Sequence, residues 1–171
     1  IGTLEASDPD SDQTITYAVI GGNGQDFFSV SASTGVIELV SEVDHEQSND
    51  LTIQVQVTDN GDPSLSTAAT IRFEIVNEND APVIESTHFS VAETLAVDSE
   101  VGTVKSSDQD TDQTLSYAIV GGAGNESFAI HQATGKITLT EPLDFDEADE
   151  LILEVRVSDN GEPVKSSTAA I

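Results

Sequence analysis

The chain of 171 residues contains no cysteine, no methionine and no tryptophan. Without cysteine it can form neither a disulfide scaffold nor a thiolate metal site. No stretch approaches the roughly 18–20 continuous apolar residues that a membrane-spanning helix requires, so we expect no direct insertion into a membrane. A small domain that lacks disulfides needs another source of stability, and bound metal ions are one candidate.

Basic residues are also scarce. The chain has 5 Lys and Arg against 32 Asp and Glu, which gives a formal net charge of −27. This balance excludes a nucleic-acid partner, because nothing in the chain could neutralise phosphates. The acidic excess has three interpretations: solvation of the surface in a salty habitat, ligands for hard cations, or both. The positions of the acids have to distinguish them.

A long internal repeat is the clearest feature that is present. Residues 1–71 align with residues 101–171 without a gap. Asp8-Pro-Asp-Ser-Asp-Gln-Thr14 recurs as Asp108-Gln-Asp-Thr-Asp-Gln-Thr114, and Asp59-Asn-Gly-Asp-Pro63 recurs as Asp159-Asn-Gly-Glu-Pro163. Such a duplication predicts two homologous domains. We assign residues 1–80 to the first, which lacks its first strand, and residues 81–171 to the second, whose last strand is truncated.

Within each repeat, apolar residues alternate with polar ones. The alternation runs through residues 15–19, 51–57 and 71–75, and its period of two predicts strands with one buried face. Gly-Gly, Thr-Gly and Asn-Gly pairs mark turns between the strands, and no helical stripe is present. The fold class is therefore all-β, with each repeat forming a β-sandwich. Residues 89–93 are predicted to be the opening strand of the second repeat, with no counterpart in the first.

The linker Asn77-Glu-Asn-Asp-Ala-Pro82 is short and directly follows the last strand of the first repeat. Pro82 fixes its own φ and biases Ala81 towards an extended backbone. Loops at one end of a sandwich lie close together, and acids and amides precede or follow strands near this joint. These residues are Asp44, Glu46, Asn77, Asn79, Asp80, Asp108, Asp110, Asp112 and Asp159.

Calcium binds six to eight oxygens from carboxylates and carbonyls, so such a cluster suits it. An EF-hand does not fit, because the sixth position of its loop would be Gln13 or Gln113 instead of glycine, and the twelfth Val19 or Ile119 instead of glutamate. The Asp-x-Asp-x-Asp run by itself is also typical of a solvated turn.

Taken together, the motifs resemble the cadherin family over essentially the whole chain. Val91-Ala-Glu93 is similar to the glutamate motif of the family's first strand, and Val43-Asp-His-Glu46 to its Leu-Asp-Arg-Glu motif. Asn77-Glu-Asn-Asp-Ala-Pro82 resembles the linker Asp-x-Asn-Asp-Asn-x-Pro, Asp108-Gln-Asp110 the Asp-x-Asp motif, and Asp159 the later-strand aspartate.

The resemblance implies tandem Ig-like Greek-key sandwiches whose short linker binds up to three Ca²⁺ ions. The innermost site would use Asn79, Asp108, Asp110, Asp159 and backbone carbonyls near Ala81 and Asp112. The middle site would use Glu46, Asn77, Asp80, Asp110 and the carbonyl of Glu78. The outer site would use Asp44, Glu46 and Asp80.

Departures from the family pattern concern the outer and middle sites. Asn77 stands where the family has aspartate, and the linker is one residue shorter. These features and the acid excess are more similar to bacterial cadherin-like surface proteins than to animal cadherins. Further half-sites would face neighbouring repeats: Asp8, Asp10, Asp59, Glu93, Asp144 and Asp146.

The resemblance implies an extracellular, calcium-stiffened adhesion or structural segment of a larger secreted or membrane-anchored protein. Its partners would be neighbouring cadherin-like repeats and a homophilic or heterophilic surface protein. The alternative is a calcium-dependent carbohydrate-binding module with polysaccharide as partner, for which only Tyr17 and Tyr117 could offer a phenolic stacking face; both alternate with core positions. No catalytic residues are predicted, since there is no nucleophile elbow and the repeated acids serve better as ligands.

Overall fold

The computed structural model of the chain describes residues 1–10, 12–85, 88–144, 146 and 149–171. The chain divides into two compact units, unit 1 from Ile1 to Glu78 and unit 2 from Asn79 to Ile171. The described residues form strands, turns and loops but no α-helix, which confirms the all-β prediction. None of them therefore belongs to a helix that could cross a membrane.

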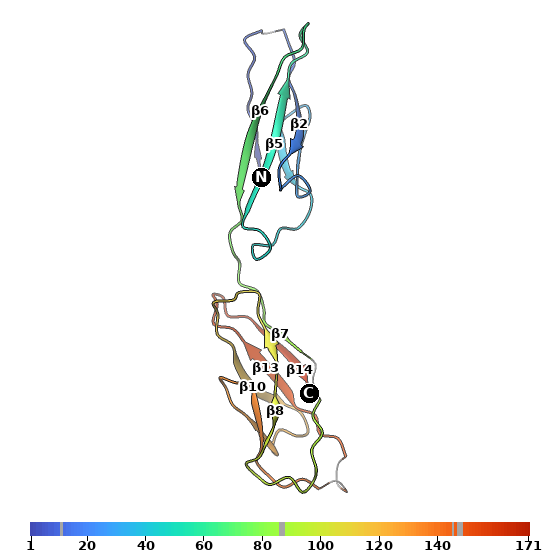
Figure 1. The fold of residues 1–171 in the computed structure, drawn as a ribbon, viewed down its shortest axis with the longest axis vertical. Helices are drawn as coiled ribbons and strands as arrows, with labels where there is room; N and C mark the ends of the chain where they lie inside the picture. Colours follow the sequence, from blue (N-terminus) through green and yellow to red (C-terminus); the bar gives the residue numbers. More distant parts are fainter. Residues whose placement is uncertain (11, 86–87, 145, 147–148) are drawn as a thin grey trace. The chain divides into compact units, whose positions relative to one another are not determined.

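Unit 1 consists of two three-stranded antiparallel sheets (Figure 1). One sheet has the order β1-β4-β3, formed by Gly2–Thr3, Val36–Leu39 and Phe28–Val30. The other has the order β2-β5-β6, formed by Thr16–Gly21, Asp50–Thr58 and Ser66–Glu74. β5 pairs with β6 over its whole length, from Asp50 opposite Glu74 to Thr58 opposite Ser66. The predicted alternation is confirmed in β5, where every second side chain from Leu51 to Val55 is buried.

The core of unit 1 lies between these sheets and is aliphatic with a few rings. Its buried members are Tyr17, Phe28, Ile37, Leu51, Ile53 and Val55. Phe28 stacks on Phe73, with ring centroids 3.9 Å apart. Each fully buried side chain of this size contributes about 1.5–3 kcal/mol, which lets a small domain without disulfides fold on its packing.

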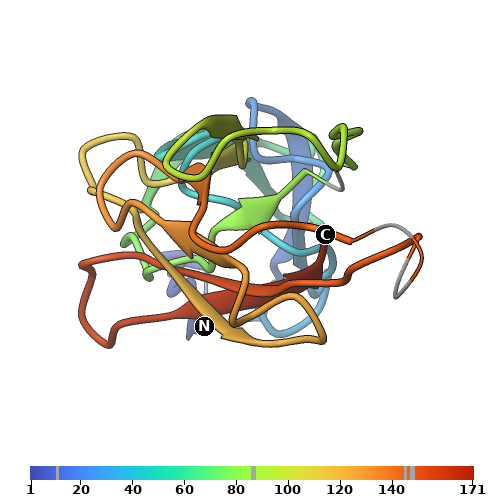
Figure 2. The same cartoon turned by 90° about the horizontal axis from the view of Figure 1, so that it is seen from below.

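Unit 2 repeats this architecture. One sheet has the order β8-β12-β11, formed by Glu100–Thr103, Lys136–Leu139 and Phe128–Ile130. A second has the order β10-β13-β14, formed by Ser116–Gly121, Glu154–Ser158 and Ser166–Ala170. β13 and β14 are the red strands along one side of unit 2 in the end-on view of Figure 2. The buried core cluster is Val104, Ile137, Leu153 and Val155.

The opening strand of unit 2 differs from the prediction. Residues 89–93 contain no strand. Instead β7, Val83–Ile84, immediately follows the linker and pairs with β9, Ser106–Ser107. Pro82 directly before it is fully buried, which anchors the start of the unit. The prediction of a strand at 89–93 was therefore wrong: Phe89 packs against the core from a loop.

Both tyrosines face inward. Tyr17 is 9% exposed, and Tyr117 is half-buried with its hydroxyl 2.7 Å from Ser106 Oγ. The ring of Tyr17 packs on Gly35, whose φ is +67° and whose added β-carbon would lie 3.0 Å from the ring. Glycine tolerates this left-handed turn and leaves room for the ring. Neither tyrosine presents the stacking face that a carbohydrate-binding module would need.

Candidate metal centre

The predicted innermost site lies entirely within unit 2, where three segments meet at one end of the sandwich. Asn79 and Asp80 precede β7, Asp108 and Asp110 lie in the loop between β9 and β10, and Asp159 directly follows β13. Each of these segments adjoins a strand, so the sheets of unit 2 hold in place the backbone that carries the side chains.

Asp110 is buried at 3% exposure although it is acidic. Its own N–H donates to Asp108 Oδ1 at 3.1 Å, which folds the Asp-x-Asp segment into a tight turn. The N–H of Asp80 donates to Asp110 Oδ2 at 2.8 Å. The loop and the linker backbone are thus joined by a charge-assisted hydrogen bond, which is among the stronger kinds.

Asp159 is buried at 5% exposure and accepts several hydrogen bonds. Gly161 N–H and Lys165 N–H donate to its Oδ1 at 3.1 and 2.9 Å, and Asn79 Nδ2 donates to its Oδ2 at 3.0 Å. Burial acts to raise the pKa of Asp159, but the hydrogen bonds from Lys165, Asn79 and Gly161 outweigh it and lower the pKa. The carboxylate is therefore held in its charged form, which a cation ligand must have.

The side-chain amide of Asn79 lies against Gly161, in the loop that follows β13. We call the space that this glycine leaves, and the matching space at Gly61 in unit 1, the glycine socket. Asn79 Nδ2 also donates to the carbonyl of Pro163 at 2.8 Å, and its Oδ1 accepts from Gln113 Nε2. A β-carbon on Gly161 would lie 2.0 Å from Asn79 Oδ1, so only glycine leaves space for the amide. Because Nδ2 has two acceptors and Oδ1 has a donor, the amide has one orientation, with Oδ1 towards Gly161 and Gln113.

The donor set suits a hard cation. Asp108 Oδ2 is buried and, in the described part of the chain, has no hydrogen-bond partner. Neither Asp108 nor Asp159 is in an ion pair there. A buried carboxylate oxygen without a partner is costly unless something positive approaches it. Among the described residues, no group of three or more His, Cys, Asp or Glu side chains is placed so that it could hold a metal ion by itself. Calcium, however, also takes amide and backbone oxygens, which Asn79 and the linker can supply.

The other predicted ligands are placed within their own units. In unit 1, Glu46 N–H donates to Asp44 Oδ1 at 2.9 Å in a turn after β4. Hydrogen bonds from the side chain and backbone of Gln47 lower the pKa of Asp44. Asn77 and Glu78 are exposed at the end of unit 1, and Ala81 and Asp112 are exposed in unit 2.

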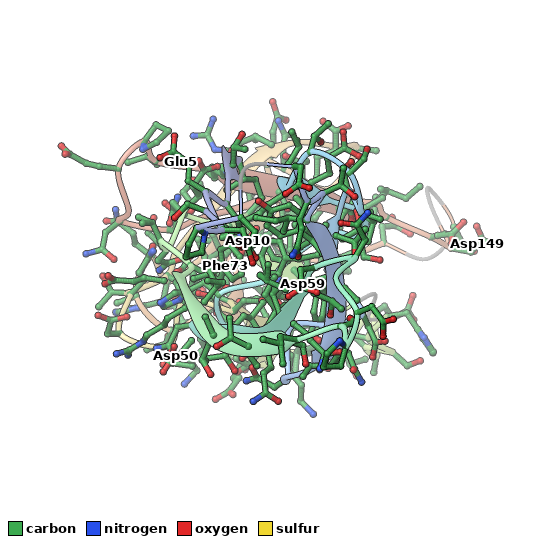
Figure 3. The ribbon with its side chains drawn as sticks, turned by 90° about the horizontal axis from the view of Figure 1, so that it is seen from above. Glu5, Asp10, Asp50, Asp59, Phe73 and Asp149 are labelled. Atoms are coloured by element: carbon green, nitrogen blue, oxygen red, sulfur yellow. The ribbon has the colours of Figure 1, made fainter. Side chains whose placement is uncertain are left out.

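The predicted half-sites fall into three groups. Asp10 N–H donates to Asp8 Oδ1 at 2.9 Å, which repeats the Asp108–Asp110 turn. Figure 3 views unit 1 from the end where Asp10 and Asp59 lie. Asp146 N–H donates to Asp144 Oδ1 at 2.9 Å in unit 2. Glu93 is exposed in the loop before β8.

Sequence reasoning missed Gln113, Gly161 and Pro163, which hold Asn79 by hydrogen bonds and by leaving space. The available signal was the repetition of Asp-Gln-Thr and of Asn-Gly-x-Pro in both halves. These motifs were interpreted as repeat markers and turns, because a glutamine or a carbonyl becomes recognisable as a contact only when its partner is in place.

Comparison with known proteins identifies the family of the chain. The sequence matches the Cadherin domain family over residues 1–76 and 87–171. It is 33% identical over 177 residues to a Drosophila melanogaster protein described as a Fat-like cadherin-related tumor suppressor homolog, and 31% identical over 169 residues to human Protocadherin Fat 1. These alignments cover 99% and 96% of the chain, which spans 4% of the length of each relative.

Solved structures give the same result for the fold. The EC1-2 segment of human Protocadherin-24 is similar with a TM-score of 0.73 and 27% identity, over 99% of this chain and 85% of that one. The EC22-24 segment of mouse Cadherin-23 is similar with a TM-score of 0.70 and 26% identity, over 99% of this chain and 57% of that one.

Proposed function

The chain belongs to the cadherin family, and on that premise we propose that it is a calcium-binding pair of repeats in the adhesion segment of a larger surface protein. Cadherin repeats of this kind are extracellular domains. The comparisons do not favour a carbohydrate-binding module, and the inward position of both tyrosines also speaks against it. The proposed role is non-catalytic binding.

One observation carries the calcium proposal: Asp110 and Asp159 are buried together with an unpartnered oxygen of Asp108, beside a linker amide seated in a glycine socket. Calcium would supply positive charge that neutralises these carboxylates. Asp108, Asp110, Asp159 and Asn79 would hold it, all through oxygen. The sequence resemblance extends the proposal to Asp44, Glu46 and Asn77 of unit 1, with three ions as a maximum.

The expected consequence is a stiffer joint between the repeats. Two carboxylates at about 4 Å repel by roughly 1–4 kcal/mol, depending on the local dielectric. Asn79 and Asp80 lie in the linker, which follows β6 after residues 75–76, and both are hydrogen-bonded to the acidic loops of unit 2. Relieving the repulsion there strengthens the attachment of the linker, so calcium binding and linker docking are thermodynamically linked.

The test is a thermal melt of the chain with millimolar Ca²⁺, with NaCl at matched ionic strength, and with a chelator. At a free concentration of one hundred times Kd, a bound ligand adds about 2.7 kcal/mol to stability. We expect Ca²⁺ to raise Tm well beyond the effect of NaCl, which only screens charge. Equal effects of the two salts would mean that the acids serve surface solvation, and the proposal would be wrong.

A further inference from the structure

Gln13 and Gln113 occupy the same position in the two repeats but make different contacts. Gln113 Nε2 donates to Asn79 Oδ1 of the linker. Gln13 Nε2 instead donates to Asp10 Oδ2 at 3.1 Å. In both repeats the Oε1 atom is buried and lacks a hydrogen-bond partner among the described residues, so the two glutamines differ in what their NH₂ group binds.

The backbone around the two glutamines is the same. Gln13 N–H donates to the carbonyl of Asp10 and Gln113 N–H to that of Asp110, both at 3.1 Å. Asn60 Oδ1 accepts from Thr14 N–H and Asn160 Oδ1 from Thr114 N–H, both at 2.7 Å. The two glutamines therefore share these backbone hydrogen bonds while their side chains have different partners.

The difference in glutamine contacts coincides with which side-chain amide lies against the glycine of each loop. At Gly161, the first atom that a β-carbon would meet is Asn79 Oδ1 at 2.0 Å. At Gly61, the first atom is Oε1 of Gln13 itself at 2.9 Å. In unit 2 the linker amide occupies the socket, and Gln113 donates to Oδ1, the amide atom nearest Gly161. In unit 1 the glutamine amide lies over the socket.

We infer that Gln113 is a positioning residue for the linker amide. Gln113 Nε2 donates to Asn79 Oδ1, and the N–H of the next linker residue, Asp80, donates to Asp110 Oδ2. Because Nδ2 of Asn79 is bound by Asp159 and Pro163, the hydrogen bond from Gln113 holds Oδ1 in place as an oxygen ligand.

The contact between Gln113 and Asn79 requires no metal, whereas its effect on calcium rests on the proposed function. Partners that orient a ligand from outside the coordination sphere typically change metal affinity 10–100-fold. Gln113→Met keeps the length of the side chain but removes the donor, and Gln13→Met is the matched control in the same turn of unit 1. We expect Gln113→Met to weaken calcium binding about tenfold and Gln13→Met to leave it unchanged.

The experiment uses the full chain and two readouts. Calorimetric titration with CaCl₂ gives affinity, and hydrogen exchange of the Asp80 amide in chelator reports linker docking without metal. Gln113→Met should accelerate that exchange, since the neighbouring linker residue loses a contact. Circular dichroism checks that both variants remain folded.

The two readouts separate the two proposals. If the wild-type chain binds no calcium but Gln113→Met still accelerates Asp80 exchange relative to Gln13→Met, the proposed function fails and the positioning of the linker by Gln113 stands. If calcium binds and both methionine variants match the wild type in both readouts, the glutamine is not a positioning residue. If exchange changes and calcium affinity does not, the role of Gln113 in presenting Asn79 to the ion is overturned.

Discussion

Asp10 and Asp110 stand at the same position of the two repeats, yet Asp10 is exposed and Asp110 is 3% exposed. The same holds for Asp59, which is half-buried, and Asp159, which is 5% exposed. The local turns are alike, because Gly61 N–H and Gly161 N–H both donate to the preceding aspartate, at 2.9 and 3.1 Å. The difference is that linker residues cover the acids of unit 2.

The acidic loops of the two units differ in what contacts their carboxylates. In unit 1, Asp10 is exposed and its Oδ2 accepts from Gln13 Nε2. When Asn79 and Asp80 are docked, the carboxylates lose water, and their burial raises the cost of leaving their charge unbalanced. A linker in place is therefore what turns a common acidic turn into a candidate cation site.

The largest expected difference comes from removing the buried carboxylate. Asp110→Ala deletes the acceptor of Asp80 N–H and one proposed calcium ligand, so the loss of affinity should reach or exceed the 10–100-fold typical of outer-shell changes. Asp10→Ala removes the same formal charge from the matched turn and should change affinity little. Calorimetric titration measures both variants, and small-angle scattering at intermediate calcium reports whether the joint stays stiff.

If Asp10→Ala and Asp110→Ala lost affinity equally, bulk charge would explain the binding. Calcium would then not be held by the linker and the loops of unit 2, even with the sandwich fold intact.

A smaller difference between the units is expected in stability when alanine replaces the glycine of each socket. In Gly161→Ala the new methyl group would overlap the amide of Asn79, so the linker must shift, at a cost of about 1–3 kcal/mol. In Gly61→Ala it would meet the flexible end of Gln13, which can swing away, so we expect a change within about 0.5 kcal/mol. Hydrogen exchange resolved by residue measures the stability of each unit separately. Equal costs for both alanine variants would contradict the socket interpretation.

The smallest difference is expected where the repeats are the same. Asn60→Ala and Asn160→Ala each remove the acceptor of a threonine N–H at 2.7 Å. A net hydrogen bond of this kind contributes about 0.5–1.5 kcal/mol, and both variants should lose a similar amount within their own unit. Chemical denaturation followed by residue-resolved exchange gives the two values. A much larger loss at Asn160 would show that the linker depends on the whole loop and not on Gly161 and Gln113.

Much of the fold was predictable because its signals are local or repetitive. Alternation in residues 51–57 predicted β5, and the repeat transferred the assignment to β13 in the second half. Residues 89–93 show the limit of this reasoning. Their apolar side chains suit a strand, but hydrogen-bonded pairing decides strand formation, and the partner of β9 is β7.

The sequence by itself determined which oxygens are available: the spacing of Asp108, Asp110 and Asp159 and the linker amide can be read directly, as can the duplication that identifies two repeats. Only the tertiary structure decided how deeply Asp110 and Asp159 are buried and which side chains contact the linker amide. Gln13 and Gln113 are the same residue in the same motif, and Gly61 and Gly161 likewise. Their contacts differ because a hydrogen bond and a van der Waals overlap depend on the partner in space, and Asn79 reaches Gly161 from a distant part of the chain.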